Sequence, residues 1–154
     1  MAVIGAVMVP HPPLIIPEVG RGEEKEIQKT IDAYRQAAQE VAALQPETII
    51  VTTPHSIMYG DYFHISPGVG AKGDFGQFRS PEVKIQVKYD TIFAEELSLE
   101  ADEHGFMAGT LGERDPRLDH GTMIPLYFIN QAYTDYQAVR IGLSGLSFAG
   151  HYTL

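Results

Sequence analysis

The sequence contains no cysteine in its 154 residues, and this absence excludes two kinds of structure. A disulfide framework cannot form, and no zinc ion can be bound through thiolates. We therefore expect an intracellular protein by default.

Positive charge is also scarce. The chain has 11 lysine and arginine residues against 20 aspartate and glutamate residues, which gives a formal net charge of −9. Proteins that bind nucleic acids or anionic membrane surfaces do so through a basic face. The composition argues against both as partners.

Long apolar runs are missing as well, since none approaches the roughly 20 residues that span a bilayer. The apolar residues 1–10 have no basic flank and lead directly into prolines, which is not typical of a signal peptide. We expect a cytoplasmic protein. With 44% apolar and 20% charged residues, the composition is that of one globular domain over residues 1–154.

The strongest functional signal is a short sequence motif, or phrase, that occurs twice in the chain. VMVPHPP at residues 7–13 and IVTTPHS at residues 50–56 each place a proline and then a histidine after a β-prone run. Proline cannot donate a hydrogen bond within a sheet, so each phrase predicts a strand end followed by a loop that carries an imidazole. The two histidines are His11 and His55.

One crossover joins the two phrases. The patterns predict a buried strand at Ala2–Val9, an amphipathic helix at Glu23–Leu44 and a second strand at Thr48–Thr53. Such crossovers are almost always right-handed and leave their two strands parallel. Parallel strands end at the same edge, where open α/β sheets bind ligands, so we expect His11 and His55 to meet there.

The rest of the chain continues the alternation of strands and helices. The glycine-rich stretch Gly68–Pro81 predicts a long mobile loop or a hairpin tip, without the Gly-Lys-Ser/Thr ending of a phosphate loop. Further strands are predicted at Tyr62–Ser66, Val83–Tyr89 (antiparallel) and Ala138–Leu143, and helices at 90–104 (capped by Asp90) and Thr122–Ala132. This order predicts an α/β fold whose mixed, mostly parallel sheet is flanked by helices on both faces in three layers.

Three of the six histidines are not candidates for a site. His104 lies at a predicted helix C-terminus, where a cation suits the dipole, His64 lies inside a strand, and His151 carries no functional argument. His11 and His55 differ because both follow strand ends at one edge. Adjacent strands lie about 4.8 Å apart, and histidine nitrogens bind first-row metals at about 2.0–2.1 Å, so both rings can share one ion. We predict that they bind a metal or a substrate.

The third candidate is the pair Asp119 and His120, which leads directly into an apolar helix. A helix N-terminus carries partial positive charge and free N–H groups. This would keep His120 neutral, as a general base or a metal ligand must be, and would favour anionic substrate oxygens. The alternative is a plain capping aspartate beside a loop histidine.

These motifs carry a family resemblance. VPHPP around His11, TPHS around His55 and LDHGTMIPLYF around His120 resemble the class III extradiol ring-cleavage dioxygenases, of the catalytic B-subunit type. They are most similar to the Memo-like branch found in the AmmeMemoRadiSam system. The similarity covers essentially the whole chain and fits a three-layer, phosphorylase/hydrolase-like fold.

The resemblance implies roles for the same residues. His11 and His55 would bind a non-haem Fe(II), and a carboxylate from the C-terminal part would be the third ligand. His120 would act as acid and base on a catechol-type aromatic substrate and O2, with Asp119 orienting it. In some branches the histidine at this position lies close enough to bind the metal.

One departure concerns the third ligand. The family continues past a strand like Val139–Leu143 into a further helix and strand, whereas this chain ends at Leu154. We expect a C-terminally truncated domain, in which the two-histidine, one-carboxylate triad is incomplete. It would be completed only if Asp119, Glu113 or a partner chain supplied the carboxylate.

Three functions compete on this basis. The first is an Fe(II)-dependent extradiol dioxygenase-like enzyme, and the second is a Memo-like protein that binds a metal or a partner without turnover. The third is a zinc hydrolase, since histidine and aspartate suit Zn²⁺ equally well. The sequence is compatible with a homo-oligomer and does not determine the oligomeric state.

Overall fold

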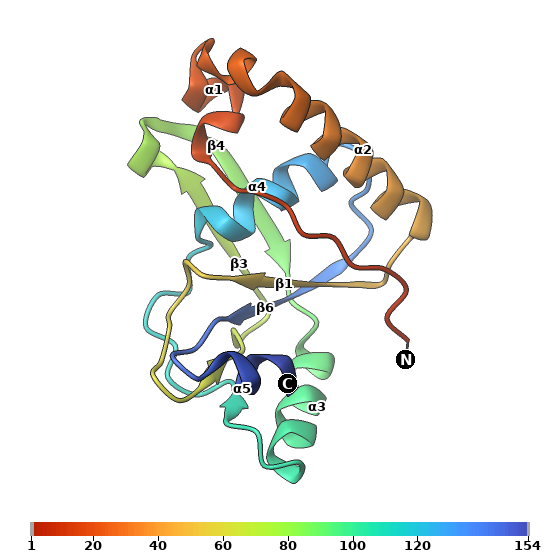
Figure 1. Ribbon diagram of the computed structural model, residues 1–154, viewed down its shortest axis with the longest axis vertical. Coiled ribbons are helices and arrows are strands. Elements are labelled where there is room, and N and C mark those ends of the chain that lie inside the picture. The colour runs from red at the N-terminus through yellow and green to blue at the C-terminus, as the bar shows by residue number, and fades with distance from the viewer. Residues whose placement is uncertain (1, 154) are drawn as a thin grey trace.

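The computed structural model describes residues 2–153, which form an α/β fold of short elements (Figure 1). The helices are α1 (Pro17–Gly20), α2 (Gln28–Leu44), α3 (Thr91–Glu103), α4 (His120–Ile129) and α5 (Phe148–Thr153). The strands are β1 (Thr48–Thr53), β2 (Phe63–His64), β3 (Gly70–Phe75), β4 (Ser80–Lys88), β5 (Ala108–Gly109) and β6 (Gln137–Gly142). Short 3-10 helices lie between them at η1 (Pro13–Ile15), η2 (Glu23–Ile27) and η3 (Gly76–Phe78).

The strands pair in three two-stranded sheets. β1 and β6 are parallel, β2 and β5 are parallel, and β3 and β4 form an antiparallel hairpin. Two isolated bridges link β6 to segments of the other sheets. Ile141 pairs with Ile65 just after β2, and Ala138 pairs with Tyr89 just after β4. The predicted α/β class with mixed pairing is confirmed, and over residues 2–153 the pairing takes the form of small sheets.

Strand β6 lies between two packed regions. Successive side chains of a strand point to opposite faces. Ala138 therefore packs in the main core, which α2 and α4 build, whereas Val139 packs with Ala94 of α3 and with Ile65. Figure 1 shows the same arrangement, with α4 above the β1–β6 pair and α3 below it.

Helix α2 matches most of the predicted crossover helix, whose first turn is the 3-10 helix η2. Its buried residues Ile31, Tyr34 and Ala38 recur at helical spacing. Tyr34 stacks on Phe128 of α4 with ring centroids 4.4 Å apart. Among residues 2–153, no helix combines the length and apolar character that crossing a bilayer requires.

Two more predictions rest on local patterns and are confirmed. The Asp90 side chain accepts a hydrogen bond from the backbone N–H of Phe93, which caps α3 as expected. In β4 the buried side chains of Ile85 and Val87 alternate with the exposed Lys84, as a strand with one covered face requires.

The predicted buried strand Ala2–Val9 is wrong. These residues form no strand and most are exposed, with Val3 at 88% and Met8 at 99%. β1 pairs with β6 alone. A β-prone segment gains stability only by packing and pairing with a neighbour, so propensity alone does not place this one in a sheet.

Of the two interpretations of Gly68–Pro81, the hairpin is correct, because β3 pairs with β4 along this stretch. Glycine allows the hairpin to pack closely. A Cβ atom added at Gly73 would lie 2.7 Å from both the carbonyl oxygen of Leu118 and the sulfur of Met123. The absence of a side chain at residue 73 therefore allows β3 to pack closely against the start of α4.

We expect Leu126→Ala to lower the free energy of unfolding by about 2–5 kcal/mol, because this side chain of α4 is fully buried and its loss leaves a cavity. Urea denaturation followed by circular dichroism measures the change. Leu99→Ala is the matched control, since Leu99 of α3 is 67% exposed and its replacement should change the free energy by less than about 0.5 kcal/mol. Equal losses would contradict the placement of α4 in the core.

Candidate metal centre

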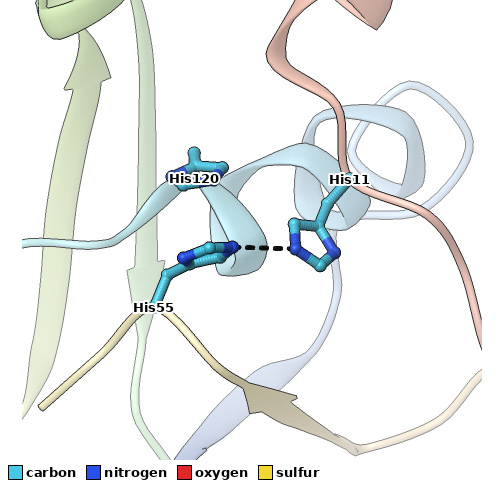
Figure 2. Close-up of side chains that lie close together, drawn as sticks. All are labelled: His11, His55 and His120. Atoms are coloured by element: carbon cyan, nitrogen blue, oxygen red, sulfur yellow. Dashed lines mark hydrogen bonds between the residues drawn. The ribbon is translucent and has the colours of Figure 1, made fainter. Parts of the chain in front are cut away.

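Three histidines from distant parts of the chain converge at one point (Figure 2). His11 lies in the extended segment before η1, His55 follows the carboxyl end of β1, and His120 is the first residue of α4. The expected meeting of His11 and His55 is confirmed, and His120 joins them.

The three rings are in contact. His11 Nε2 lies 2.9 Å from His55 Nε2. The ring centroids of His55 and His120 are 4.0 Å apart, and those of His11 and His120 are 5.8 Å apart. One ring nitrogen from each histidine can be chosen so that all three lie within 4.8 Å of one another.

This spacing suits one shared metal ion. Two nitrogens bound to the same ion at about 2.0–2.1 Å, with an angle of about 90–110° between them, lie roughly 2.9–3.4 Å apart. The Nε2 atoms of His11 and His55 are 2.9 Å apart. Without a metal, the same contact needs one ring to donate its N–H to the other. Imidazole binds zinc, iron and copper alike, so the donor set selects no single metal.

The loop that carries His11 is fixed to helix α2. The hydroxyl of Tyr34 donates a hydrogen bond to the carbonyl oxygen of Pro10 at 2.7 Å. Prolines on both sides of His11 restrict the backbone further, which lowers the entropy lost when a ligand orders the loop. The position of His11 therefore depends on these contacts, although the strand predicted before it does not form.

Asp119 joins the two other histidine-bearing elements. Its carboxylate accepts hydrogen bonds from the hydroxyl of Thr53 at 2.7 Å and from the backbone N–H of Thr122 at 3.0 Å, the second of which caps α4. The Thr53 hydroxyl in turn accepts a hydrogen bond from the backbone N–H of His55 at 3.2 Å. One carboxylate thus ties the end of β1 to the start of α4.

A glycine permits this close approach. A Cβ atom added at Gly121 would lie 2.6 Å from the Thr53 hydroxyl oxygen and 3.1 Å from Cδ2 of His55. A larger residue at this position would separate β1 from α4. His55 and His120 can share one site because residue 121 has no side chain.

The surroundings favour a neutral His120. Burial lowers the pKa of His120 below its ordinary value, His55 and His11 lower it further, and Asp119 opposes them. The ring of Phe78 lies edge-on to His120 with centroids 5.3 Å apart. A neutral imidazole keeps a free lone pair, which both a metal ligand and a general base require.

A cavity of about 980 Å³ opens beside the histidines. His55 and His120 line one part of it, and the β3–β4 hairpin and the loop before α4 line much of the rest. Arg140 of β6 also reaches its wall. The histidine cluster therefore faces a space large enough for a small-molecule ligand.

Sequence reasoning missed a buried polar cluster around Arg140, which is 2% exposed. Its Nε donates to the hydroxyl of Ser66 at 2.6 Å, and a terminal nitrogen donates to the carbonyl oxygen of Arg117 at 2.7 Å. The guanidinium also lies 3.4 Å from the carboxylate of Glu113 and 3.6 Å from that of Asp119. A charged residue inside a strand that is otherwise buried was the available signal, because a buried charge needs partners.

The structure also places the other candidates. Within residues 2–153, the histidine cluster includes neither Asp119 nor Glu113, and no hydrogen bond joins the Asp119 carboxylate to the His120 ring. His104 is exposed at the end of α3 and lies 3.4 Å from Glu100. His151 accepts a hydrogen bond from the backbone of Ser144.

His64 is a core residue. It is 1% exposed, and neither of its ring nitrogens has a hydrogen-bond partner among the described residues. The carboxylate of Glu113 lies 4.0 Å from its Nε2. Burial lowers the pKa of His64, Arg140 lowers it as well, and Glu113 opposes them.

We expect Thr53→Val to weaken metal binding by roughly tenfold. The variant loses two hydrogen bonds of the Thr53 hydroxyl, one to the Asp119 carboxylate and one from the backbone N–H of His55. The buried carboxylate would also lose one partner, which costs about 1–3 kcal/mol of stability. Titration with Zn²⁺ and urea denaturation measure the two effects. Thr52→Val, on the exposed face of β1, is the control and should change neither. If the two variants have the same metal affinity and stability, the proposed role of the Thr53 hydroxyl is contradicted.

We expect His64 to destabilise the fold as the pH falls. Its pKa is lowered in the native state, so below about pH 6.5 the unfolded chain binds a proton that the folded chain resists, and stability falls. The slope cannot exceed about 1.4 kcal/mol per pH unit. The free energy of unfolding, measured without metal from pH 7.5 to 5, should fall less steeply in His64→Leu than in the wild type. Parallel curves for His64→Leu and wild type would refute the assignment.

Comparison with known proteins agrees with this geometry. Residues 5–154 match the family model described as the catalytic LigB subunit of aromatic ring-opening dioxygenase. The chain is 37% identical over 163 aligned residues to Protein CA_C1420 of Clostridium acetobutylicum. That alignment covers 96% of this chain and 33% of the relative, so the chain spans about a third of the length of that protein. The family match covers nearly every residue, including all three histidines of the cluster, and the chain belongs to the family of the catalytic LigB subunit of aromatic ring-opening dioxygenases.

Proposed function

We propose that this chain provides the metal centre of an extradiol dioxygenase-like enzyme that opens a catechol-type aromatic ring with O2. The observation that carries the proposal is the convergence of three imidazoles, with ring nitrogens within 4.8 Å of one another, in a chain of the LigB family. Two of them, His55 and His120, line a cavity. His11 and His55 would hold Fe(II). Bound iron would supply a site at which the substrate hydroxyl groups and O2 come together.

The protein side chains divide the remaining tasks. His11 and His55 present their Nε2 atoms to one point, and the Asp119 carboxylate keeps β1 and α4 in register behind them. We propose that His120 removes a proton from a substrate hydroxyl group and later returns one. Its lowered pKa supports this role, because the ring must be neutral to accept that proton. Asp119 supports His120 from the helix N-terminus.

We also propose the three-layer arrangement that the family resemblance implies. Ala138 and Val139 of β6 pack toward helices on opposite sides. This supports the three-layer arrangement in which a mixed, mostly parallel sheet is covered on both faces. We also propose that the chain belongs to the Memo-like branch of this family.

A second candidate is a zinc-dependent hydrolase. The cluster among the described residues contains three histidines and no carboxylate. Three histidines with an open fourth position form the ligand set of carbonic anhydrase, where zinc activates a water molecule. The metal that remains bound after purification without added metal separates the two candidates.

We expect anaerobically reconstituted protein to bind one Fe(II) per chain and to consume O2 when catechols are added. His11→Ala and His55→Ala should each weaken iron binding by more than about 100-fold, because each removes a direct ligand. His104→Ala, which removes an exposed histidine far from the cluster in sequence, is the control and should leave binding unchanged. Metal analysis and an oxygen electrode measure the two properties.

His120→Ala separates the roles of the third histidine. As a proton-transfer residue, it should leave iron binding within about tenfold of wild type and abolish O2 consumption. A loss of iron binding as large as that of His11→Ala would make His120 a ligand instead. Iron binding without any O2 consumption across a broad catechol panel would favour the Memo-like protein without turnover.

A further inference from the structure

We propose that Arg140 of β6 is a positioning residue for His120, which it places by fixing the segment that leads into α4. The guanidinium contacts three residues of that segment, Glu113, Arg117 and Asp119. That His120 transfers a proton rests on the proposed function. That Arg140 determines where the His120 ring lies rests on the contacts of Arg140, and it is testable without turnover.

The backbone of Arg140 is fixed on both sides. Arg140 pairs with Val51 of β1 in the parallel register, and its carbonyl oxygen accepts a hydrogen bond from the backbone N–H of Ser66 at 2.9 Å. The residue is 2% exposed. The side chain therefore starts from a rigid base, and the groups around it set the direction of its guanidinium.

The guanidinium uses each of its nitrogens for a different group. Nε donates to the Ser66 hydroxyl at 2.6 Å, which orients the plane of the guanidinium. One terminal nitrogen donates to the carbonyl oxygen of Arg117 at 2.7 Å and lies 3.6 Å from Oδ2 of Asp119. The other donates to the Glu113 carboxylate at 3.4 Å. The donors of arginine form a rigid planar fork, so the single ammonium group of lysine cannot reproduce this set of directions.

The segment held in this way has no regular structure of its own. Residues 110–119, between β5 and α4, contain neither helix nor strand. The backbone N–H of Leu118 donates to the carbonyl oxygen of Lys72 in β3 at 3.1 Å. The Arg140 contacts fall at Glu113, Arg117 and Asp119, the last of which directly precedes His120. Arg140 consequently fixes the approach to α4 at three points.

Arg140 also acts on the orientation of the Asp119 carboxylate. Oδ1 accepts hydrogen bonds from Thr53 and from the backbone of Thr122, whereas Oδ2 accepts one from the Thr122 hydroxyl and is the oxygen nearest to Arg140. The Asp119 and Glu113 side chains are only 10% and 17% exposed. Without the guanidinium, two largely buried negative charges would lose their compensating charge and move toward solvent. A displaced Asp119 alters the start of α4, where His120 is the first residue.

The position of His120 in the folded protein separates this role from one in stability alone. If Arg140 only stabilises the fold, the folded fraction of a variant keeps the wild-type position of the His120 ring. If Arg140 positions the ring, the folded fraction has a displaced ring. Phe78 is a suitable reporter, because its ring lies edge-on to His120 with centroids 5.3 Å apart.

The test is nuclear magnetic resonance on metal-free protein with labelled histidine and phenylalanine, in which His120→Gln assigns the His120 signals. In Arg140→Lys the His120 ring signals should shift, and the Overhauser contact with Phe78 should be lost. The signals of His104, which is exposed at the end of α3, are the internal reference. Arg35→Lys is the matched control, because Arg35 is 57% exposed and pairs with Asp32 on α2. It should leave every ring signal unchanged.

A second variant keeps the test decisive where Arg140→Lys does not fold. Ser66→Ala retains the guanidinium and removes only the acceptor of its Nε hydrogen bond. It should shift the His120 signals in the same direction and to a smaller extent. Circular dichroism establishes which variants are folded. Wild-type His120 signals in folded Arg140→Lys, or in Ser66→Ala where Arg140→Lys is unfolded, would overturn the positioning role.

Turnover then tests the link to the proposed function. In anaerobically reconstituted protein, Arg140→Lys should lower the kcat of O2 consumption with catechol by about 10–100-fold, because proton transfer requires a correctly placed ring. Iron affinity should stay within about tenfold of wild type, since His11 and His55 have supports of their own. If the wild type consumes no O2 while Arg140→Lys still displaces His120, the reaction fails and the positioning role stands. Lost turnover with unchanged His120 signals would make Arg140 a ligand contact in the cavity wall and overturn the proposal.

Discussion

The carboxylate of Asp119 holds together the parts of the chain that carry two of the three clustered histidines. It caps α4, accepts the Thr53 hydroxyl at the end of β1 and lies 3.6 Å from the buried guanidinium of Arg140. A buried guanidinium is tolerated only with charged partners and hydrogen bonds around it, and a helix N-terminus needs an acceptor for its free N–H groups. One side chain meets both needs at the point where two histidines meet.

The three histidines are consequently positioned by three different physical means. His120 is placed by the capped start of α4, and His55 by the backbone link from its N–H to Thr53. His11 is placed by its flanking prolines and by the hydrogen bond from Tyr34 to Pro10. Since the support of His11 is separate from the linked supports of His55 and His120, the cluster does not require a continuous sheet through the N-terminal residues, and the small sheets of β1–β6 and β3–β4 suffice to frame it.

Local patterns predicted much of this structure, and contacts between distant residues account for what they missed. The Asp90 cap, the alternation in β4 and the helical spacing in α2 each depend on neighbours in sequence, and all three were found. The strand at Ala2–Val9 failed because a strand exists only with a partner, which propensity cannot supply. The role of Gly73 depends on Leu118 and Met123, which its surrounding sequence does not reveal. The sequence around Arg140 signals a buried charge, but it does not identify Glu113 and Asp119 as the partners.

The chemistry available at the cavity follows from the charge state that the surroundings favour for His120. Burial and the neighbouring histidines favour a neutral ring, so His120 can offer a lone pair to a metal or accept a proton. The Asp119 carboxylate opposes this shift, but it accepts its hydrogen bonds from the start of α4 and from the Thr53 hydroxyl and not from the ring. A carboxylate at this place therefore fixes the position of His120 without engaging its ring nitrogens, and that position decides which atom of a ligand lies beside the ring.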